Sequence, residues 1–177
     1  MFFEDAVEGS RIMELTLTGR DCGLKERAPM CGVPYHSVDT YVQKLISKGY
    51  KVAICEQMED PALAKGLVQR SVTRVITPGT VIEEKLLDAG KNNYLMSVYY
   101  TDSGIGYAYA DVSTGIFFTG ELSENGGKDA LLNELGRIAP SECIANEAFF
   151  SHEYLKKRFQ NVCYLEKEPD SVFQSRR

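Results

Sequence analysis

Residues 29–57 read PMCGVPYHSVDTYVQKLISKGYKVAICEQ, and this stretch decides the fold expected for the first half of the chain. Two prolines around Gly32 predict a stiff loop. A helix follows, because apolar residues recur on one side at helical spacing: Val38, Tyr41, Val42, Leu45 and Ile46. Ser37 is a candidate N-cap, and Gly49 predicts the end of the helix. The apolar run within Tyr50–Gln57 then predicts a strand buried on both faces, so the stretch indicates an α/β domain.

The flanking segments extend this first domain. Acidic residues in the first turn and helical spacing predict a helix over Glu4–Glu14, and alternation predicts a short strand over Leu15–Thr18. Phe2 and Phe3 are expected in the core. The β-branched segment Arg70–Thr77 predicts a further strand, whereas Leu63–Gln69 is ambiguous because Gly66 interrupts its helical pattern.

The second half of the chain shows a different order of elements. Three strands joined by turns come first, followed by a helix, a strand, a helix and a strand; the expected ranges are 94–100, 105–111, 116–122, 128–137, 142–145, 149–159 and 162–164. This order is that of the opening of a ribonuclease-H-like fold. We therefore predict a first domain over 1–81, a linker over 82–93 and a second domain over 94–177, truncated at its C-terminus.

Charge differs between the two halves. Residues 1–81 contain ten basic and ten acidic residues, and residues 82–177 contain ten and fifteen, which gives the net charge of −5. Neither half is the basic body expected of a protein that grips DNA alone through its phosphates. The five cysteines form no CxxC pair, so we expect reduced thiols in a cytoplasmic protein and no structural zinc site. No apolar run approaches a membrane span, and no secretory signal is visible.

Two kinds of enzyme site can be weighed from motifs. No GxxxxGK[ST] segment is present, so we expect no ATP site in this chain. The segment YTDSG at 100–104 is similar to the first-strand motif of ribonuclease H enzymes, and Asp102, Asp111 and Glu134 could form a two-metal nuclease site. The simpler interpretation is that Asp102 occupies a hairpin turn, where Asp is common. We therefore expect no catalytic residues and no metal ligands.

The wording of the central stretch resembles a known family. PMCGVPYH, the helix and VAICEQMEDP resemble the mismatch-recognition domain of the MutS family of DNA mismatch-repair proteins, as do LTLTGR before them and KGLVQRSVTRVITPGT after them. The resemblance continues, less strongly, into the family's connector domain. It implies a small mixed-sheet mismatch-recognition domain, here lacking its first strand, followed by a truncated ribonuclease-H-like connector that is not a nuclease.

The resemblance also implies where DNA would bind. Arg20 and Arg70 match basic positions near the DNA backbone, where a guanidinium would contact phosphate. Met30 lies in the loop that resembles the family's minor-groove-side loop, and His36 lies just beyond it. Asp21 departs from the pattern, since an acid beside the phosphates weakens a contact from Arg20. The family's Phe-x-Glu wedge is not assigned to Phe2-Phe3-Glu4, which matches the following helix instead.

The whole family protein would be a cytoplasmic, dimeric, ATP-driven sensor of mispaired and unpaired bases. The resemblance implies that ATP and magnesium belong to an ATPase domain downstream, that the connector offers a surface to MutL, and that this chain is a recognition module and no enzyme. Two alternatives stay open. One is a metal-dependent nuclease built on Asp102; the other is a protein-interaction module without DNA binding, which the neutral to acidic charge allows.

Overall fold

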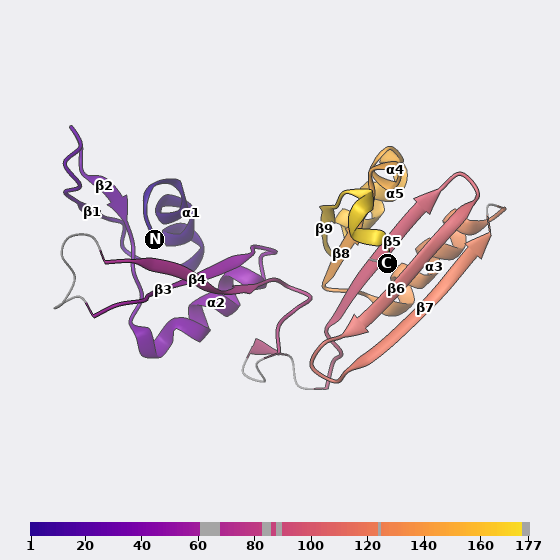
Figure 1. Cartoon of the computed structure of the whole chain (residues 1–177), viewed down its shortest axis with the longest axis horizontal. Helices are drawn as coiled ribbons and strands as arrows, with labels where there is room; N and C mark the ends of the chain where they lie inside the picture. Colours follow the sequence, from indigo (N-terminus) through magenta and orange to yellow (C-terminus); the bar gives the residue numbers. More distant parts are fainter. Residues whose placement is uncertain (61–67, 83–85, 88–89, 124, 175–177) are drawn as a thin grey trace. The chain divides into compact units, whose positions relative to one another are not determined.

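The computed structural model describes residues 1–60, 68–82, 86–87, 90–123 and 125–174 (Figure 1). These residues form two compact units, Met1–Ile76 and Thr77–Arg177, each built from helices and strands, which confirms the α/β class. Part of the predicted linker, residues 83–85 and 88–89, lies outside the described residues. The same holds for residues 63–67 of the ambiguous segment.

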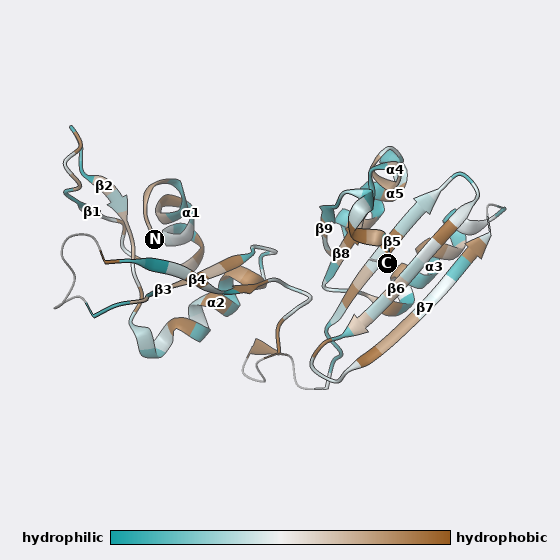
Figure 2. Cartoon of the chain, in the orientation of Figure 1, coloured by the Kyte–Doolittle hydropathy of each residue, from teal (hydrophilic) through white to brown (hydrophobic). Residues whose placement is uncertain are grey.

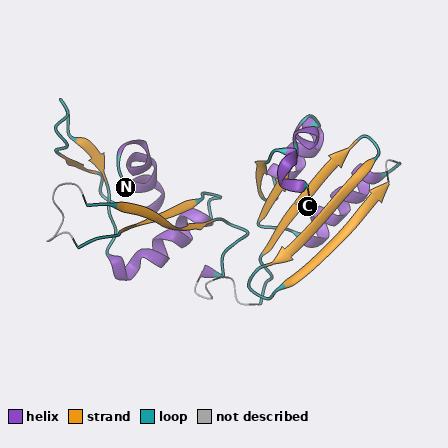
Figure 3. Cartoon of the chain, viewed as in Figure 1, coloured by secondary structure: helices purple, strands orange, loops and turns teal. Residues whose placement is uncertain are grey.

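The described part of the first unit contains two α-helices and two small sheets (Figure 3). Its elements are α1 (Phe3–Met13), β1 (Thr18–Arg20), β2 (Ala28–Met30), the 3-10 helix η1 (Tyr35–Ser37), α2 (Val38–Ile46), β3 (Val52–Gln57) and β4 (Arg70–Ile76). Strand β1 pairs with β2 and strand β3 with β4, both antiparallel. Within the described residues these two antiparallel pairs stand in place of the small mixed sheet that we predicted, and Phe2 forms an isolated bridge to Met30 on the second edge of β2.

Helix α2 follows its predicted pattern. Val42 and Leu45 are buried on the apolar side, and Leu45 joins Ala6, Met13 and Cys31 in a small core between α1, α2 and the loop after β2. The chain leaves the helix at Gly49, whose φ of +82° a residue without a Cβ adopts freely. Ser37 occupies the N-cap position without a side-chain capping bond. An ion pair of 2.9 Å between Lys44 and Glu14 links α2 to the end of α1.

Three expectations for the first unit are wrong. Strand β3 is not buried on both faces: Cys55 and the residues after it are exposed, since its two-stranded sheet has no covering layer on one side in the part of the unit that is described. The short strand lies at Thr18–Arg20 and not at Leu15–Thr18, because Thr18 pairs with Met30. Phe2 and Phe3 are 40% and 53% exposed and therefore do not belong to the core.

The second unit is built on one five-stranded sheet. Its elements are β5 (Tyr94–Thr101), β6 (Gly104–Asp111), β7 (Ile116–Ser123), α3 (Gly127–Ile138), β8 (Glu142–Ala145), α4 (Glu147–Phe150), α5 (Glu153–Gln160), β9 (Tyr164–Lys167) and the 3-10 helix η3 (Asp170–Phe173). The strand order is β7-β6-β5-β8-β9. The first three strands form an antiparallel meander, and β8 and β9 run parallel to β5.

One face of this sheet carries the core of the unit. Met96 and Val98 of the central strand are fully buried, together with Leu131 of α3, Phe149 of α4 and Phe159 of α5. The helix predicted over 149–159 is in fact two helices, because the Asn146 side chain accepts a hydrogen bond from the Phe149 N–H and caps a separate short helix. The last strand lies at Tyr164–Lys167, later than the predicted 162–164, where it pairs with β8.

A buried carboxylate fixes the turn at the start of the second unit. The Glu142 side chain, 3% exposed, accepts hydrogen bonds from the Thr77 hydroxyl and from the Gly79 N–H, the latter at 2.9 Å. The Asn93 side chain donates to the Pro78 carbonyl at 2.9 Å. These bonds attach residues 77–80 to the five-stranded sheet, so these residues belong to the second unit. The chain therefore divides between Ile76 and Thr77, before the domain boundary that we predict at 81.

We predict that Gly79→Ala destabilises the second unit. A Cβ at this position would lie 2.8 Å from the Glu142 Cβ, closer than real Cβ contacts occur, and at a tight 3.1 Å from the Leu95 Cβ. Overpacking of this kind costs about 1–3 kcal/mol, and urea denaturation followed by circular dichroism would measure it.

Gly136→Ala in α3 is the matched control. A Cβ there meets no atom within 4 Å, so the helix-favouring alanine should leave the midpoint unchanged or raise it. Equal midpoints for the two variants would show that the contact between the turn and Glu142 does not constrain the fold.

Candidate nucleic-acid interface

The β1–β2 hairpin holds two of the residues predicted to contact DNA. Arg20 is opposite Ala28, and Thr18 is opposite Met30, whose carbonyl accepts a hydrogen bond of 2.9 Å from the Thr18 hydroxyl. Arg20 and Thr18 are two residues apart on one strand, so Arg20 and Met30 face the same side of the small sheet. Arg20 is exposed and Met30 half-buried. The structure therefore brings these two residues together.

The loop of this hairpin adds cations that the sequence did not single out. Lys25 and Arg27 are exposed, and the Arg27 stem lies over Gly19, where a Cβ would come within 3.1 Å of the Arg27 Cβ. The Asp21 carboxylate accepts a hydrogen bond of 2.9 Å from the Gly23 N–H, so it is engaged in the turn. These two residues belong to the loop of a hairpin, and the sequence did not show this because the hairpin is recognised only from the pairing of β1 with β2.

His36 lies on η1, the 3-10 turn that follows the loop after β2. Its side chain is exposed, and the neighbouring Tyr35 is 89% exposed. Backbone bonds hold the start of this segment, since the Cys31 N–H donates to the Met1 carbonyl and the Ser37 N–H to the Pro34 carbonyl. An exposed imidazole and an exposed aromatic ring are therefore presented from a fixed turn close in sequence to Met30.

Arg70 lies on the other small sheet. It is the first residue of β4, is exposed, and is opposite Gln57 at the end of β3. The Met58 N–H donates to the Gln69 carbonyl at 2.9 Å, which extends the pairing of the two strands by one residue beyond Gln57 and Arg70. The described interactions do not link Arg70 to Arg20, Met30 or His36.

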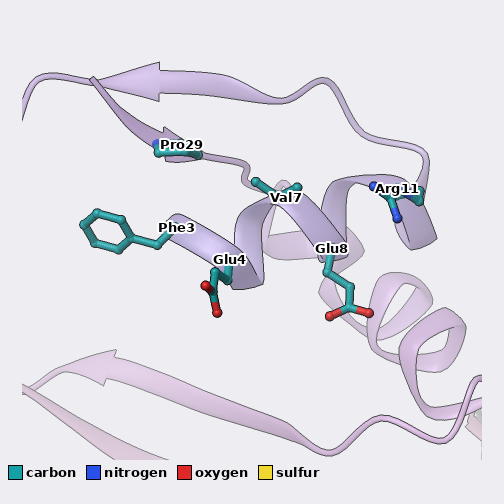
Figure 4. Close-up of a pocket in the computed structure, with 6 residues that line it drawn as sticks. All are labelled: Phe3, Glu4, Val7, Glu8, Arg11 and Pro29. Carbon is teal, nitrogen blue, oxygen red and sulfur yellow. The ribbon is translucent and has the colours of Figure 1, made fainter. Parts of the chain in front are cut away.

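A shallow pocket lies on the outer side of α1. Phe3, Glu4, Val7, Glu8 and Arg11 line it from the helix, and Pro29 lines it from β2 (Figure 4). Glu8 accepts a hydrogen bond of 2.5 Å from the Tyr50 hydroxyl, and this bond raises the pKa of Tyr50 above its ordinary value. Its lining combines two carboxylates with one guanidinium, that of Arg11, so its net charge does not favour phosphate.

The carboxylates of the alternative nuclease site do not come together. Asp102 occupies the exposed turn between β5 and β6, and Asp111 ends β6 at the opposite end of that strand. An eight-residue strand is roughly 27 Å long, whereas the ions of a two-metal site lie about 3.5–4 Å apart. Glu134 is held on α3 by Arg137, whose Nη2 lies 2.5 Å from a carboxylate oxygen. The described residues contain no cluster of three or more His, Cys, Asp or Glu side chains that could hold a metal ion.

Asp111 has a structural explanation. It is 1% exposed and accepts hydrogen bonds from the Ser113 N–H and hydroxyl at 2.9 and 2.6 Å, from the Thr114 N–H, and from the Asn93 N–H. Burial by itself would raise the pKa of this carboxyl, but the hydrogen bonds outweigh it and lower the pKa below the ordinary 3.8. The carboxylate closes the β6–β7 turn, and both of its oxygens accept hydrogen bonds from the protein.

Similarity to known proteins covers nearly the whole chain. Residues 1–85 match the family model described as MutS domain I, and residues 93–176 match MutS domain II. Proteins called DNA mismatch repair protein MutS from Acetivibrio thermocellus, Alkaliphilus metalliredigens and Clostridium tetani are 56%, 57% and 47% identical over 89%, 81% and 95% of this chain. The matched region is 18%, 16% and 19% of those proteins, so the chain spans less than a fifth of their length.

In the described part of the chain no helix is long and apolar enough to cross a membrane.

We predict that Asp111→Asn destabilises the second unit and that magnesium has no effect on its stability. Loss of a buried acceptor costs about 1–3 kcal/mol at neutral pH. A carboxyl whose pKa is lowered by folding stabilises the fold above its unfolded pKa, and this contribution disappears as the pH falls through the folded pKa. The difference in free energy of unfolding between the variant and the wild-type chain should therefore become smaller as the pH falls below 3.8.

Thermal unfolding with and without millimolar Mg²⁺ measures both effects. Asp102→Asn, in the exposed turn, is the matched control and should change little. Stabilisation of the wild-type chain by Mg²⁺, lost in either variant, would contradict the structural role and restore the nuclease alternative.

Proposed function

Because the chain belongs to the MutS family of DNA mismatch repair proteins, we propose that it supplies a DNA-contacting module and a connector module to a protein that recognises mispaired or unpaired bases in duplex DNA. The family membership supports DNA mismatch recognition as the general function. The geometry of the two units supports a separate role for each.

The DNA-contacting module is the first unit. The observation that carries this proposal is the β1–β2 hairpin, which presents Arg20 from a paired strand and the exposed Lys25 and Arg27 from the loop between the two strands. Guanidinium groups bind phosphate oxygens through paired, charge-assisted hydrogen bonds. Met30, on the same side of the hairpin as Arg20, would lie against the groove edge, and His36 on η1 would donate a hydrogen bond nearby.

Arg70 would add a second phosphate contact from the β3–β4 hairpin. The first unit carries no net charge, since its cations are balanced in number by acids along the chain. Its grip on DNA is therefore local, and tight binding would require the rest of the protein. This favours a module over a free-standing DNA-binding domain.

The second unit would be the connector. Its three antiparallel strands followed by two parallel strands in the order β7-β6-β5-β8-β9 support a ribonuclease-H-like fold. Its excess of acids disfavours contact with DNA and suits a unit that meets protein. In the whole protein this unit would pass conformational change toward an ATPase that binds ATP and magnesium, within a homodimer that engages MutL.

We predict that Arg20→Ala weakens binding to matched and mismatched duplexes alike. Loss of one phosphate contact should cost about 1 kcal/mol, or roughly fivefold in affinity, and should reduce the salt slope by about one unit. Arg70→Ala should behave in the same way. Fluorescence anisotropy with a labelled duplex at several salt concentrations measures both quantities.

The control is Arg158→Ala on α5, an exposed arginine of the second unit. It should leave affinity and salt slope unchanged. Equal losses in all three variants would mean that any surface cation contributes. No binding by the wild-type chain at low salt would favour the alternative of a protein-interaction module.

A further inference from the structure

Strand β7 forms one edge of the sheet of the second unit. Among the described strands it pairs only with β6, over the full run from Asp111↔Ile116 to Gly104↔Ser123 and without a register shift (Figures 1 and 3). Half of its backbone N–H and C=O groups therefore point away from the sheet. A straight edge of eight residues is long enough to template another strand.

The side chains of this edge are unusually apolar. Ile116, Phe117 and Phe118 are 37%, 66% and 51% exposed, and Figure 2 shows this apolar run at the start of β7. Natural edge strands are protected by lysine, proline, a bulge or a short length. β7 has none of these devices, and its sequence IFFTGELS holds one charge, Glu121.

The two phenylalanines line opposite faces of the edge. Phe118 stacks on Tyr109 of β6 with ring centroids 5.0 Å apart, and the Arg137 guanidinium lies 5.6 Å from the centroid of the same tyrosine ring. Phe117 points to the other face, because successive side chains of a strand alternate. An added strand would therefore find apolar contacts on both faces, with the ring of Phe118 already held in place.

We propose that the β7 edge binds an extended segment of a partner protein, which adds a sixth strand antiparallel to β7. Water hydrogen-bonds the N–H and C=O groups of a free edge one by one, whereas an extended polypeptide pairs with the whole row in register, so the partner that fits this edge is an extended segment. Opposite Ile116, Phe117 and Phe118 it would carry apolar residues, and opposite Glu121 a lysine or arginine. Read from its own N-terminus, the antiparallel partner segment therefore has the pattern basic-x-x-apolar-apolar-apolar.

Charge selects a partner protein over a second copy of this chain. Residues 77–177, the second unit, contain ten basic and fifteen acidic residues, so two copies would repel each other. The acidic Glu121 next to the apolar run instead complements a basic segment. A single added strand buries less than the roughly 1,200 Å² of a stable interface, so the complex is transient. This proposal does not depend on DNA binding by the first unit.

The test is the binding of a labelled peptide to the complete 177-residue chain. The peptide SKTTVFVTG follows the required pattern, and fluorescence anisotropy reports its affinity. Phe117→Lys should weaken binding at least tenfold, since it removes the most exposed apolar contact and faces a lysine-bearing peptide. Val162→Lys, at a residue that is 48% exposed between α5 and β9, is the matched control and should bind as the wild-type chain does.

Two N-methylated versions of the peptide separate backbone pairing from side-chain adhesion. Methyl groups on alternate residues block one hydrogen-bonding edge of the peptide in the first version and the other edge in the second. An added strand predicts that one version loses binding and the other keeps it. Equal binding of both versions, no binding of the parent peptide, or a wild-type chain that dimerises in sedimentation and loses its dimer with Phe117→Lys would overturn the proposal.

Discussion

The candidate interface depends on the backbone pairing that holds β2 between two neighbours. On one side β2 pairs with β1, and on the other Met30 is bridged by Phe2 while the Cys31 N–H donates to the Met1 carbonyl. Cys31, at the end of this segment, is buried against Ala6 and Met13 of α1. Three-residue strands are marginal by themselves. The hairpin that carries Arg20 and Met30 is therefore positioned by its attachment to α1.

The second unit is constrained differently. Its central strand β5 is paired on both edges, antiparallel to β6 and parallel to β8, and its inward residues Met96 and Val98 are fully buried. Polar groups in this core are satisfied by fixed partners: Glu142 binds the turn at 77–80, and Asn146 bonds both the N–H and the C=O of Tyr100. Among the described strands, β7 is left paired on one edge only.

Local pattern predicted much of the fold, and non-local contacts account for what it missed. The apolar stripe and Gly49 predicted α2, and the Asp102-Ser103 turn predicted the β5–β6 hairpin, because these signals lie within one element. The prediction that β3 is buried on both faces was wrong, because burial depends on which other elements pack on the sheet, and an apolar run does not reveal this. The predicted helix over 149–159 was wrong because the capping role of Asn146 depends on its contact with β5.

The candidate site was predictable to a similar extent. The family resemblance pointed to Arg20, Arg70, Met30 and His36, and the structure places Arg20 and Met30 on one hairpin while Arg70 begins another sheet. Lys25 and Arg27 were missed because charge alone does not distinguish a hairpin tip from a solvated loop. The three carboxylates of the nuclease alternative could be rejected only once β6 separated Asp102 from Asp111.

We expect DNA to contact the first unit and to leave the second unit free. The most direct measurement is an NMR titration of the ¹⁵N-labelled chain with a short duplex at low salt. We predict that amide shifts concentrate in β1, the loop at 21–27, β2, η1 and the start of β4, and are absent from β5 to β9. Shifts concentrated in the second sheet, or shifts spread evenly over exposed cations of both units, would contradict it.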